Sequence, residues 1–157
     1  MKKTLVVSLA AVAVLALGGC SVIASGEAAL TIDDGRVIAI VEMCEDADAN
    51  TVDEVHLLPS DGQLFFLPRP SWSFDATTSA RVDLGSVDEF VDHFDDRQMK
   101  LEPSTGSAYV GPVYLDEETV GALKTGELLV SSGDDAVILT AEEFEAAVAK
   151  TCGVFDY

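Results

Sequence analysis

Residues 28–43 read AALTIDDGRVIAIVEM, two β-prone runs on either side of Asp33-Asp34-Gly35. Asp-Gly between two such runs is a strong signal for a β-hairpin. The second run, residues 36–43, is apolar on both faces, which is typical of a strand that is covered on both sides. The sequence therefore predicts a hairpin whose second strand lies in the centre of a sheet.

Short strand-like segments recur along the rest of the chain. They cover residues 51–58, 63–67, 80–84, 98–102, 108–115, 127–131 and 136–139. Pro68 and Pro70 cannot donate to a ladder, so we expect residues 68–72 to form a loop or an edge crossing. This spacing of strands favours an α+β, mostly β fold: an antiparallel sandwich or a strongly curved sheet, with a C-terminal helix and one or two short helices.

Two capping boxes mark the starts of helices. They are Ser-Val-Asp-Glu at residues 86–89 and Thr-Ala-Glu-Glu at residues 140–143, each before an apolar segment. A shorter helical turn is expected at residues 116–123. In the last helix, spacings of four residues place three side chains on the face that turns inward: Phe144, Val148 and Cys152.

The chain is strongly acidic. Its 157 residues include 28 Asp and Glu but only 9 Lys and Arg, which gives a formal net charge of −19 at pH 7. Phosphate binding requires clustered basic residues, so this composition argues against nucleic acid as a partner. The length suits one domain with a substantial core.

The first twenty residues have the features of an export signal. Lys2-Lys3 leads into an apolar run at residues 5–17, followed by Gly18-Gly19-Cys20. A charged start, a short apolar core and small residues before the cut are typical of a secretory signal, and the run is short for a membrane span. The segment resembles the lipobox of bacterial lipoproteins, with Leu17 as the branched residue three places before the cysteine.

That resemblance implies a location and an anchor. It implies a signal peptide over residues 1–19, removed after Cys20 receives a diacylglyceryl group, usually with a further acyl chain such as palmitate. Two or more chains give stable anchoring. We therefore expect a lipid-anchored tether at residues 20–27 and one acidic β-rich domain at residues 28–157, on the extracytoplasmic face of a bacterial cell membrane. The chain also looks like the small lipoproteins of unknown function common in GC-rich Gram-positive bacteria.

Two further cysteines, Cys44 and Cys152, remain after Cys20 is used by the lipid. Disulfides form and persist in exported domains. We expect these two cysteines to bond to each other and to join the last helix to the strand that ends at Cys44; two buried free thiols are the alternative.

One loop has a partial metal-ligand pattern. Asp46, Asp48 and Asn50 place oxygen ligands at alternate positions, as the start of a calcium loop does. However, Thr51 stands where an EF-hand needs glycine and Leu57 where it needs a bidentate Glu. A solvated acidic loop is the favoured interpretation, and the sequence indicates no metal or other cofactor.

Two other residues are candidates for a functional site. His93 lies among Asp92, Asp95 and Asp96, which a metal or acid–base site could use, although the chain lacks a zinc-protease spacing. Trp72 follows a proline-rich segment and could present a platform for a sugar or a partner protein. Packing of Trp72 into the core is the favoured interpretation, because most lone aromatic residues serve packing.

No recognisable active site is present in the sequence. Motifs for serine hydrolases, Cys-x-x-Cys redox pairs and phosphate-binding glycine loops are missing. The leading interpretation is a non-catalytic binding or interaction module of the cell envelope, whose partner is an envelope protein or a cell-wall glycan. The alternatives are a cell-envelope hydrolase that uses carboxylates or His93, and an accessory subunit of an envelope complex. Nothing in the sequence predicts an oligomeric state.

Overall fold

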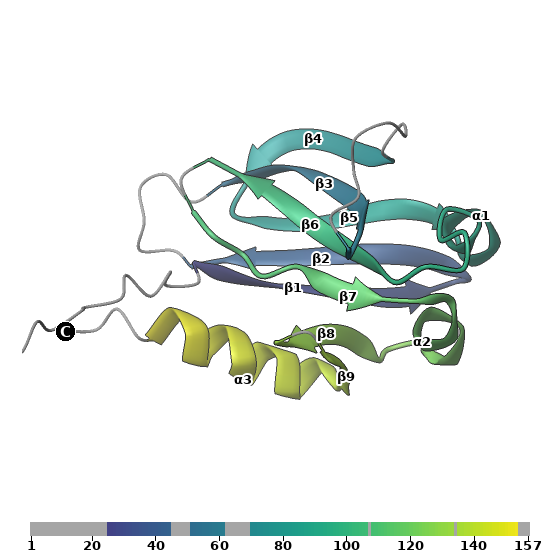
Figure 1. Ribbon diagram of the computed structural model, residues 1–157. Helices are drawn as coiled ribbons and strands as arrows, with labels where there is room; N and C mark the ends of the chain where they lie inside the picture. The colour runs from purple at the N-terminus through teal and green to yellow at the C-terminus, as the bar shows by residue number, and fades with distance from the viewer. Residues whose placement is uncertain (1–24, 45–50, 62–69, 107, 134, 154–157) are drawn as a thin grey trace, which may run out of the picture.

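The computed structural model describes residues 25–44, 51–61, 70–106, 108–133 and 135–153. These residues form two antiparallel sheets, one long helix and two short helices (Figure 1). The expected strand at residues 63–67 lies outside the described residues. The prediction of a mostly β, α+β fold with a C-terminal helix is confirmed.

The first sheet has five strands in the order β5-β2-β1-β8-β9. Their bounds are Gly26–Asp33 (β1), Arg36–Met43 (β2), Ser79–Ser86 (β5), Leu128–Ser132 (β8) and Asp135–Leu139 (β9). β1 and β2 form the expected hairpin, because Asp34 (φ 47°) and Gly35 (φ 73°) adopt the left-handed conformation that a two-residue hairpin turn of the common I′ type requires. β2 lies between β1 and β5, as its two apolar faces predict. Since β1 begins at Gly26, Gly26 and Glu27 belong to the sheet and not to the tether.

The second sheet has four strands in the order β4-β3-β6-β7. Their bounds are Val52–Pro59 (β3), Ser71–Thr77 (β4), Met99–Thr105 (β6) and Val113–Leu115 (β7). β4 begins directly after Pro70 and is an edge strand, so the missing proline donor disrupts no inner ladder. β7 is shorter than the strand expected at residues 108–115; Pro112, which lacks an N–H, immediately precedes it.

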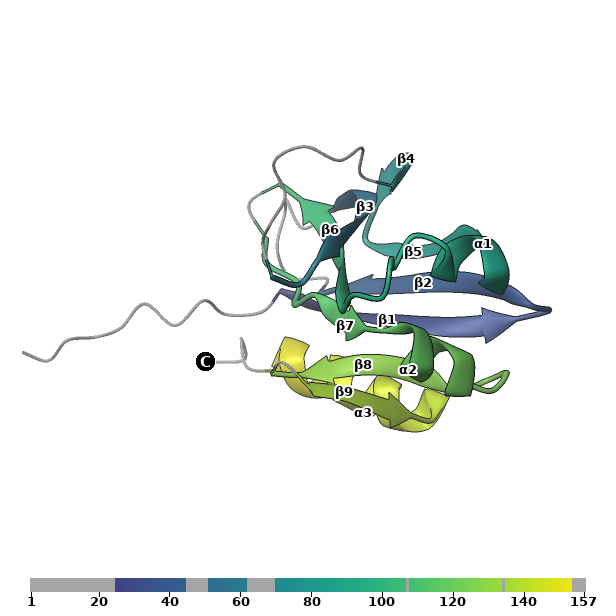
Figure 2. The same ribbon diagram turned by 45° about the vertical axis from the view of Figure 1, so that its right-hand side comes forward.

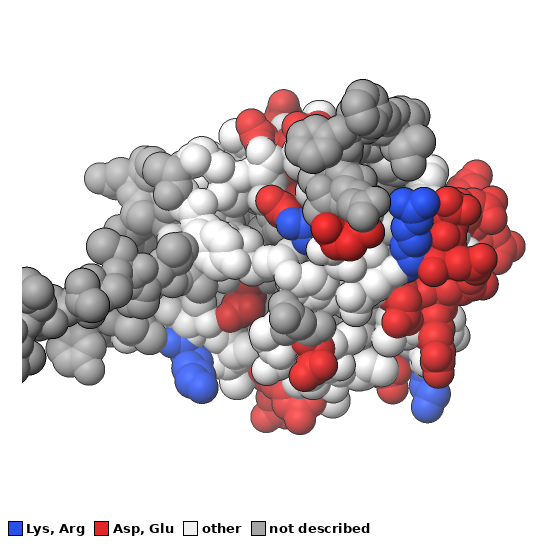
Figure 3. Space-filling model, in the orientation of Figure 1, with Lys and Arg blue, Asp and Glu red and all other residues white. Residues whose placement is uncertain are grey.

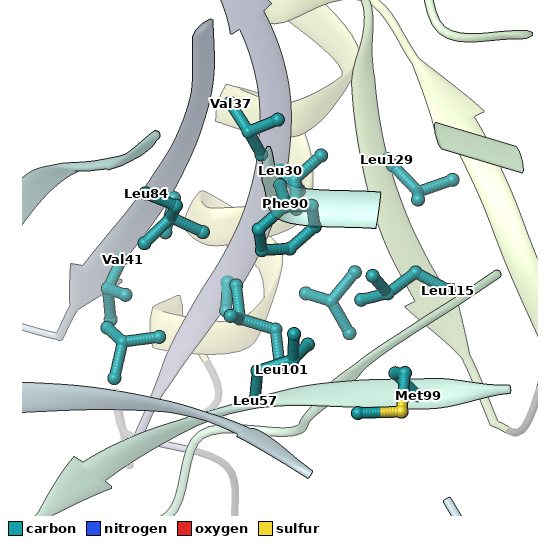
Figure 4. Packing of buried hydrophobic residues seen from close by; sticks show 14 of the residues in the cluster. Leu30, Val37, Val41, Leu57, Leu84, Phe90, Met99, Leu101, Leu115 and Leu129 are labelled. Atoms are coloured by element: carbon teal, nitrogen blue, oxygen red, sulfur yellow. The ribbon is translucent and has the colours of Figure 1, made fainter. Parts of the chain in front are cut away.

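The two sheets face each other across the main core. Leu30 and Val41 of the first sheet and Leu57 and Leu101 of the second are buried in one cluster around Phe90 (Figure 4). Phe90 itself is fully buried and meets Phe94 edge to face, with ring centroids 5.4 Å apart. The arrangement is therefore a sandwich whose core is filled by inward side chains from both sheets.

The three helices have different positions. Their bounds are Val87–Val91 (α1), Glu117–Ala122 (α2) and Ala141–Cys152 (α3). Each begins with a capping box, two of which the sequence predicts. α1 and α2 lie at one end of the sandwich, whereas α3 runs along the outer face of the five-stranded sheet (Figures 1 and 2).

α3 is held to that face by a second, smaller apolar cluster and by a disulfide. Phe144 is buried against Ala29, Ile40, Leu128 and Val130, and Val148 packs beside them. Cys44, directly after β2, is bonded to Cys152 at the end of α3, with 5.2 Å between the Cα atoms. Both the inward face of α3 and the predicted pairing of these cysteines are confirmed.

Candidate functional site

Four of the predicted site residues lie outside the described residues. They are the lipidation residue Cys20 and the three loop residues proposed as weak metal ligands, Asp46, Asp48 and Asn50. Those assignments stay predictions.

Trp72 lies in β4 opposite Val55 of β3. Its half-buried ring packs against the main core, with its centroid 6.3 Å from that of Phe90. The contacts of this ring are therefore packing contacts, in line with the favoured interpretation, and a binding platform at Trp72 stays a prediction.

His93 lies in the exposed turn that follows α1, and its backbone N–H donates to the carbonyl of Phe90 at 3.2 Å. Asp92, Asp95 and Asp96 are exposed around it, and acidic side chains gather at this end of the sandwich (Figure 3). Among the described residues, no three His, Cys, Asp or Glu side chains are placed to hold a metal ion together. The structure thus gives a His93-based site no support.

A hollow of about 600 Å³ lies over strands β3, β6 and β7 and the segment that joins β6 to β7. We call it the polar hollow. Its lining consists of His56, Leu58, Lys100, Glu102, Pro103, Ser104, Thr105, Ala108, Tyr109, Val110, Pro112 and Tyr114. Its size falls within the range of small-molecule sites in proteins.

The strand register builds the floor of the polar hollow. His56 of β3 lies opposite Glu102 of β6, and Lys100 of β6 lies opposite both Leu58 of β3 and Tyr114 of β7. The neighbours of these residues along each strand, such as Leu57 and Leu101, are buried in the main core. Because successive side chains of a strand point to opposite faces, the floor residues lie on the outer face of the four-stranded sheet.

The polar side chains on this face contact one another, and Lys100 forms an ion pair with Glu102. Lys100 Nζ lies 2.6 Å from Glu102 Oε2, and His56 Nε2 lies 3.5 Å from Glu54 Oε2. Ser73 Oγ donates to Glu54 Oε1 at 3.3 Å. Of these residues His56, Lys100 and Glu102 line the hollow, so its lining offers both donors and acceptors, although the protein as a whole is strongly acidic.

Two tyrosines line the polar hollow from well-fixed backbone. Val110 beside Tyr109 is buried, and the carbonyl of Tyr109 accepts the N–H of Ser25 at 2.7 Å. Tyr114 lies between buried Val113 and Leu115, and its N–H donates to Ser131 Oγ at 2.6 Å. Tyr114 is half-buried on the outer face of β7, and Tyr109, in the segment before β7, is 47% exposed.

A second hollow, of about 590 Å³, runs beside α3 on the outer face of the five-stranded sheet. We call it the apolar groove. Its lining includes Ile32, Ile40, Leu128, Phe144 and Val148, with Glu42, Arg81 and Glu145 among its charged residues. Ile40, Leu128 and Phe144 are already buried in the small cluster under α3, so these three side chains have a packing role.

The shifted pKa values belong to structural contacts outside both hollows. The hydrogen bond from Arg36 lowers the pKa of Asp83, and capping hydrogen bonds from Ser86 and Thr140 lower the pKa values of Glu89 and Glu143. Within the described part of the chain, Thr31 is the one buried polar residue, and its Oγ1 donates to the carbonyl of Glu127 at 2.7 Å. The groups with these lowered pKa values therefore serve ion pairing and helix capping.

Sequence reasoning missed His56, Lys100, Tyr109 and Tyr114 as neighbours in one hollow. The available signal was a tyrosine between two apolar residues, in Ala108-Tyr109-Val110 and again in Val113-Tyr114-Leu115. In a strand-like segment this pattern turns the ring away from the core.

No helix in the described ranges is long and apolar enough to cross a membrane. The chain matches no protein-family description, no curated protein and no solved structure.

Proposed function

We propose that the protein is a lipid-anchored binding module on the extracytoplasmic face of a bacterial membrane, and that the polar hollow is its ligand site. The observation that carries the proposal is the hollow itself. Its floor and wall present paired charges and two outward tyrosines, whereas the described residues hold no buried ionisable group that could act as a catalyst.

Two features support the proposed location. The sequence around Cys20 resembles a lipobox, and a disulfide joins Cys44 to Cys152, as is common in exported domains. Neither feature depends on the other, since the disulfide cysteines lie outside the signal segment.

The proposed anchor and the hollow would lie close together. Ser25, where the described chain begins, donates its N–H to the carbonyl of Tyr109 at the hollow. Residues 20–24, even fully extended, reach at most about 18 Å. A ligand in the polar hollow would therefore lie near the membrane surface.

The anchor is tested by changing Cys20→Ser in the producing cell. We expect the variant to be released into the medium or to stay as an uncut precursor, because the thioether to the lipid cannot form. Fractionation and intact-mass spectrometry measure both outcomes. Ser21→Ala is the matched control, since it removes one hydroxyl beside Cys20 and keeps the thiol. Membrane retention of Cys20→Ser at the mature mass would refute the lipid anchor.

A further inference from the structure

We infer that the polar hollow binds an uncharged oligosaccharide, with Tyr109 and Tyr114 as the rings against which the sugar packs. This inference rests on the proposed function, because it names the ligand class of the same site. It requires no contribution from Trp72, whose ring belongs to the core.

The rings of Tyr109 and Tyr114 are suited to packing against a sugar. A tyrosine offers a large apolar face at low conformational cost, together with a hydroxyl for hydrogen bonding. The C–H face of a pyranose ring is apolar and flat enough to pack on such a face. Tyr109 has the largest exposed fraction among the large apolar side chains of the described residues, and its backbone is held by Ser25. The ring is therefore available without a costly rearrangement of the chain.

The ion pair between Lys100 and Glu102 favours an uncharged ligand. Lys100 is neutralised by Glu102, and Glu54 lies beside His56. An anionic ligand would meet the field of a chain with net charge −19, and a cationic ligand would have to displace Lys100 from Glu102. An uncharged ligand avoids both costs.

The lining of the polar hollow contains both hydrogen-bond donors and hydrogen-bond acceptors. Lys100 and the hydroxyls of the tyrosines and Ser104 can donate, and Glu102 can accept, as can Thr105 Oγ1, whose own hydrogen is donated to the carbonyl of Ala108. Vicinal hydroxyl groups of a sugar donate and accept at once, so they match such a set. An apolar ligand would take water from the hydroxyls of Tyr109, Tyr114 and Ser104 without replacing its hydrogen bonds, which costs binding free energy.

The test is a titration of the mature protein, held in a detergent without sugar groups, with uncharged oligosaccharides of glucose, mannose and N-acetylglucosamine. Saturation-transfer NMR detects binding and calorimetry gives the Kd. We expect at least one of these oligosaccharides to bind, and Tyr109→Ala and Tyr114→Ala each to weaken it by about tenfold, because each removes a packing ring.

Matched variants separate the ring from other effects. Tyr109→Phe keeps the ring and should bind nearly as the wild type does. Ile138→Ala, which shortens an equally exposed apolar side chain on β9 outside the hollow, should leave binding unchanged. Circular dichroism shows whether each variant is folded.

Three outcomes overturn the inference: none of the uncharged oligosaccharides binds, an oligogalacturonate binds instead of them, or Tyr109→Ala binds as tightly as the wild type. If Cys20→Ser still releases the protein in such a case, the ligand class fails while the proposed anchoring stands. If an oligosaccharide does bind, vesicles carrying a neutral glycolipid, compared with the free oligosaccharide, distinguish a membrane source of the sugar from a cell-wall source.

Discussion

The outer faces of the two sheets carry hollows of nearly equal volume, about 590 Å³ beside α3 and about 600 Å³ over β3 and β6. Their linings differ. Beside α3, the floor is made of side chains such as Ile40 and Phe144 that are already buried in a packing cluster. Over β3 and β6, side chains such as Lys100 and Tyr109 point away from the core. The volume of a hollow therefore does not identify a site. What distinguishes the two hollows is whether their lining side chains are already buried in a packing cluster.

The apolar groove exists because a single helix is narrower than the five-stranded sheet on which it packs. α3 packs over β1, β8 and β9, and a single helix is about 10 Å across, whereas five strands span about 20 Å between the axes of the outer two. The outer face of β5 is therefore left beside the helix, whereas Ile40 of β2 packs in the cluster under α3. There β5 carries Arg81 and Asp83, which are exposed to water. We interpret this groove as the uncovered margin of a packing interface.

If α3 is a structural cover, the disulfide at its end should have the largest effect on stability. Replacing both Cys44 and Cys152 by Ser opens a loop with a sequence separation of 108 residues. The chain-entropy model gives about 4–5 kcal/mol for a loop of this length. We expect the free energy of unfolding, measured in urea, to fall by up to that amount.

The same variant should also show where stability is lost. Hydrogen exchange should speed up most in residues 141–152, because the disulfide ties this helix to β2, and much less in β3 and β6. If hydrogen exchange became faster to the same degree in α3 and in the four-stranded sheet, the disulfide would not act mainly by holding α3 on the five-stranded sheet. The oxidised wild type and the wild type treated with reductant are the controls.

The next largest effect is expected from the small cluster itself. Phe144→Ala removes the one fully apolar ring that α3 buries, and a buried Phe→Ala change costs about 3 kcal/mol or more. Tyr109→Ala, on the other outer face, should change the free energy of unfolding by no more than about 0.5 kcal/mol, as exposed positions usually do. Urea unfolding measures both variants. Similar losses for the two would remove the distinction between the two faces.

Local signals in the sequence were sufficient for the elements that make up most of this comparison. Asp34 and Gly35 supply the turn that pairs β1 with β2, and the capping boxes at Ser86 and Thr140 place the starts of α1 and α3. Residues 68–72 were expected to form a loop or an edge crossing because of Pro68 and Pro70, and no expectation covered the rest of β4, which is an edge strand. It becomes a strand through pairing with β3, a partner that no local pattern reveals.

The polar hollow could not be predicted for the same reason. Its residues come from β3, β6 and β7, and only the register of these strands brings His56, Lys100 and Tyr114 onto one face. Trp72, for which packing into the core was the favoured interpretation, lies on the inner face of the same sheet. Strand alternation explains both results, since the face of a residue depends on a register that sequence alone does not give.

The smallest expected effect is the pH dependence of the stability that the N-terminal cap of α3 contributes. The N–H and Oγ of Thr140 donate to the carboxylate of Glu143 at 2.8 and 2.9 Å, and these hydrogen bonds lower the pKa of Glu143 in the folded protein. A lowered folded pKa means that the stabilisation is present above the ordinary Glu pKa of about 4.3 and is lost as the pH falls through the folded value. Glu143→Gln keeps a capping acceptor without the charge, so we expect its melting temperature to lie below that of the wild type at pH 6 and to meet it in acid.

Protonation of the other carboxylates also relieves repulsion in this acidic chain, and comparing the two proteins at each pH cancels that contribution. Glu142→Gln removes the same charge from the same turn without changing the cap, and its difference from the wild type should vary less with pH. A constant difference between Glu143→Gln and the wild type from pH 6 down to acid would show that the charge of the cap does not help to hold α3 on its sheet.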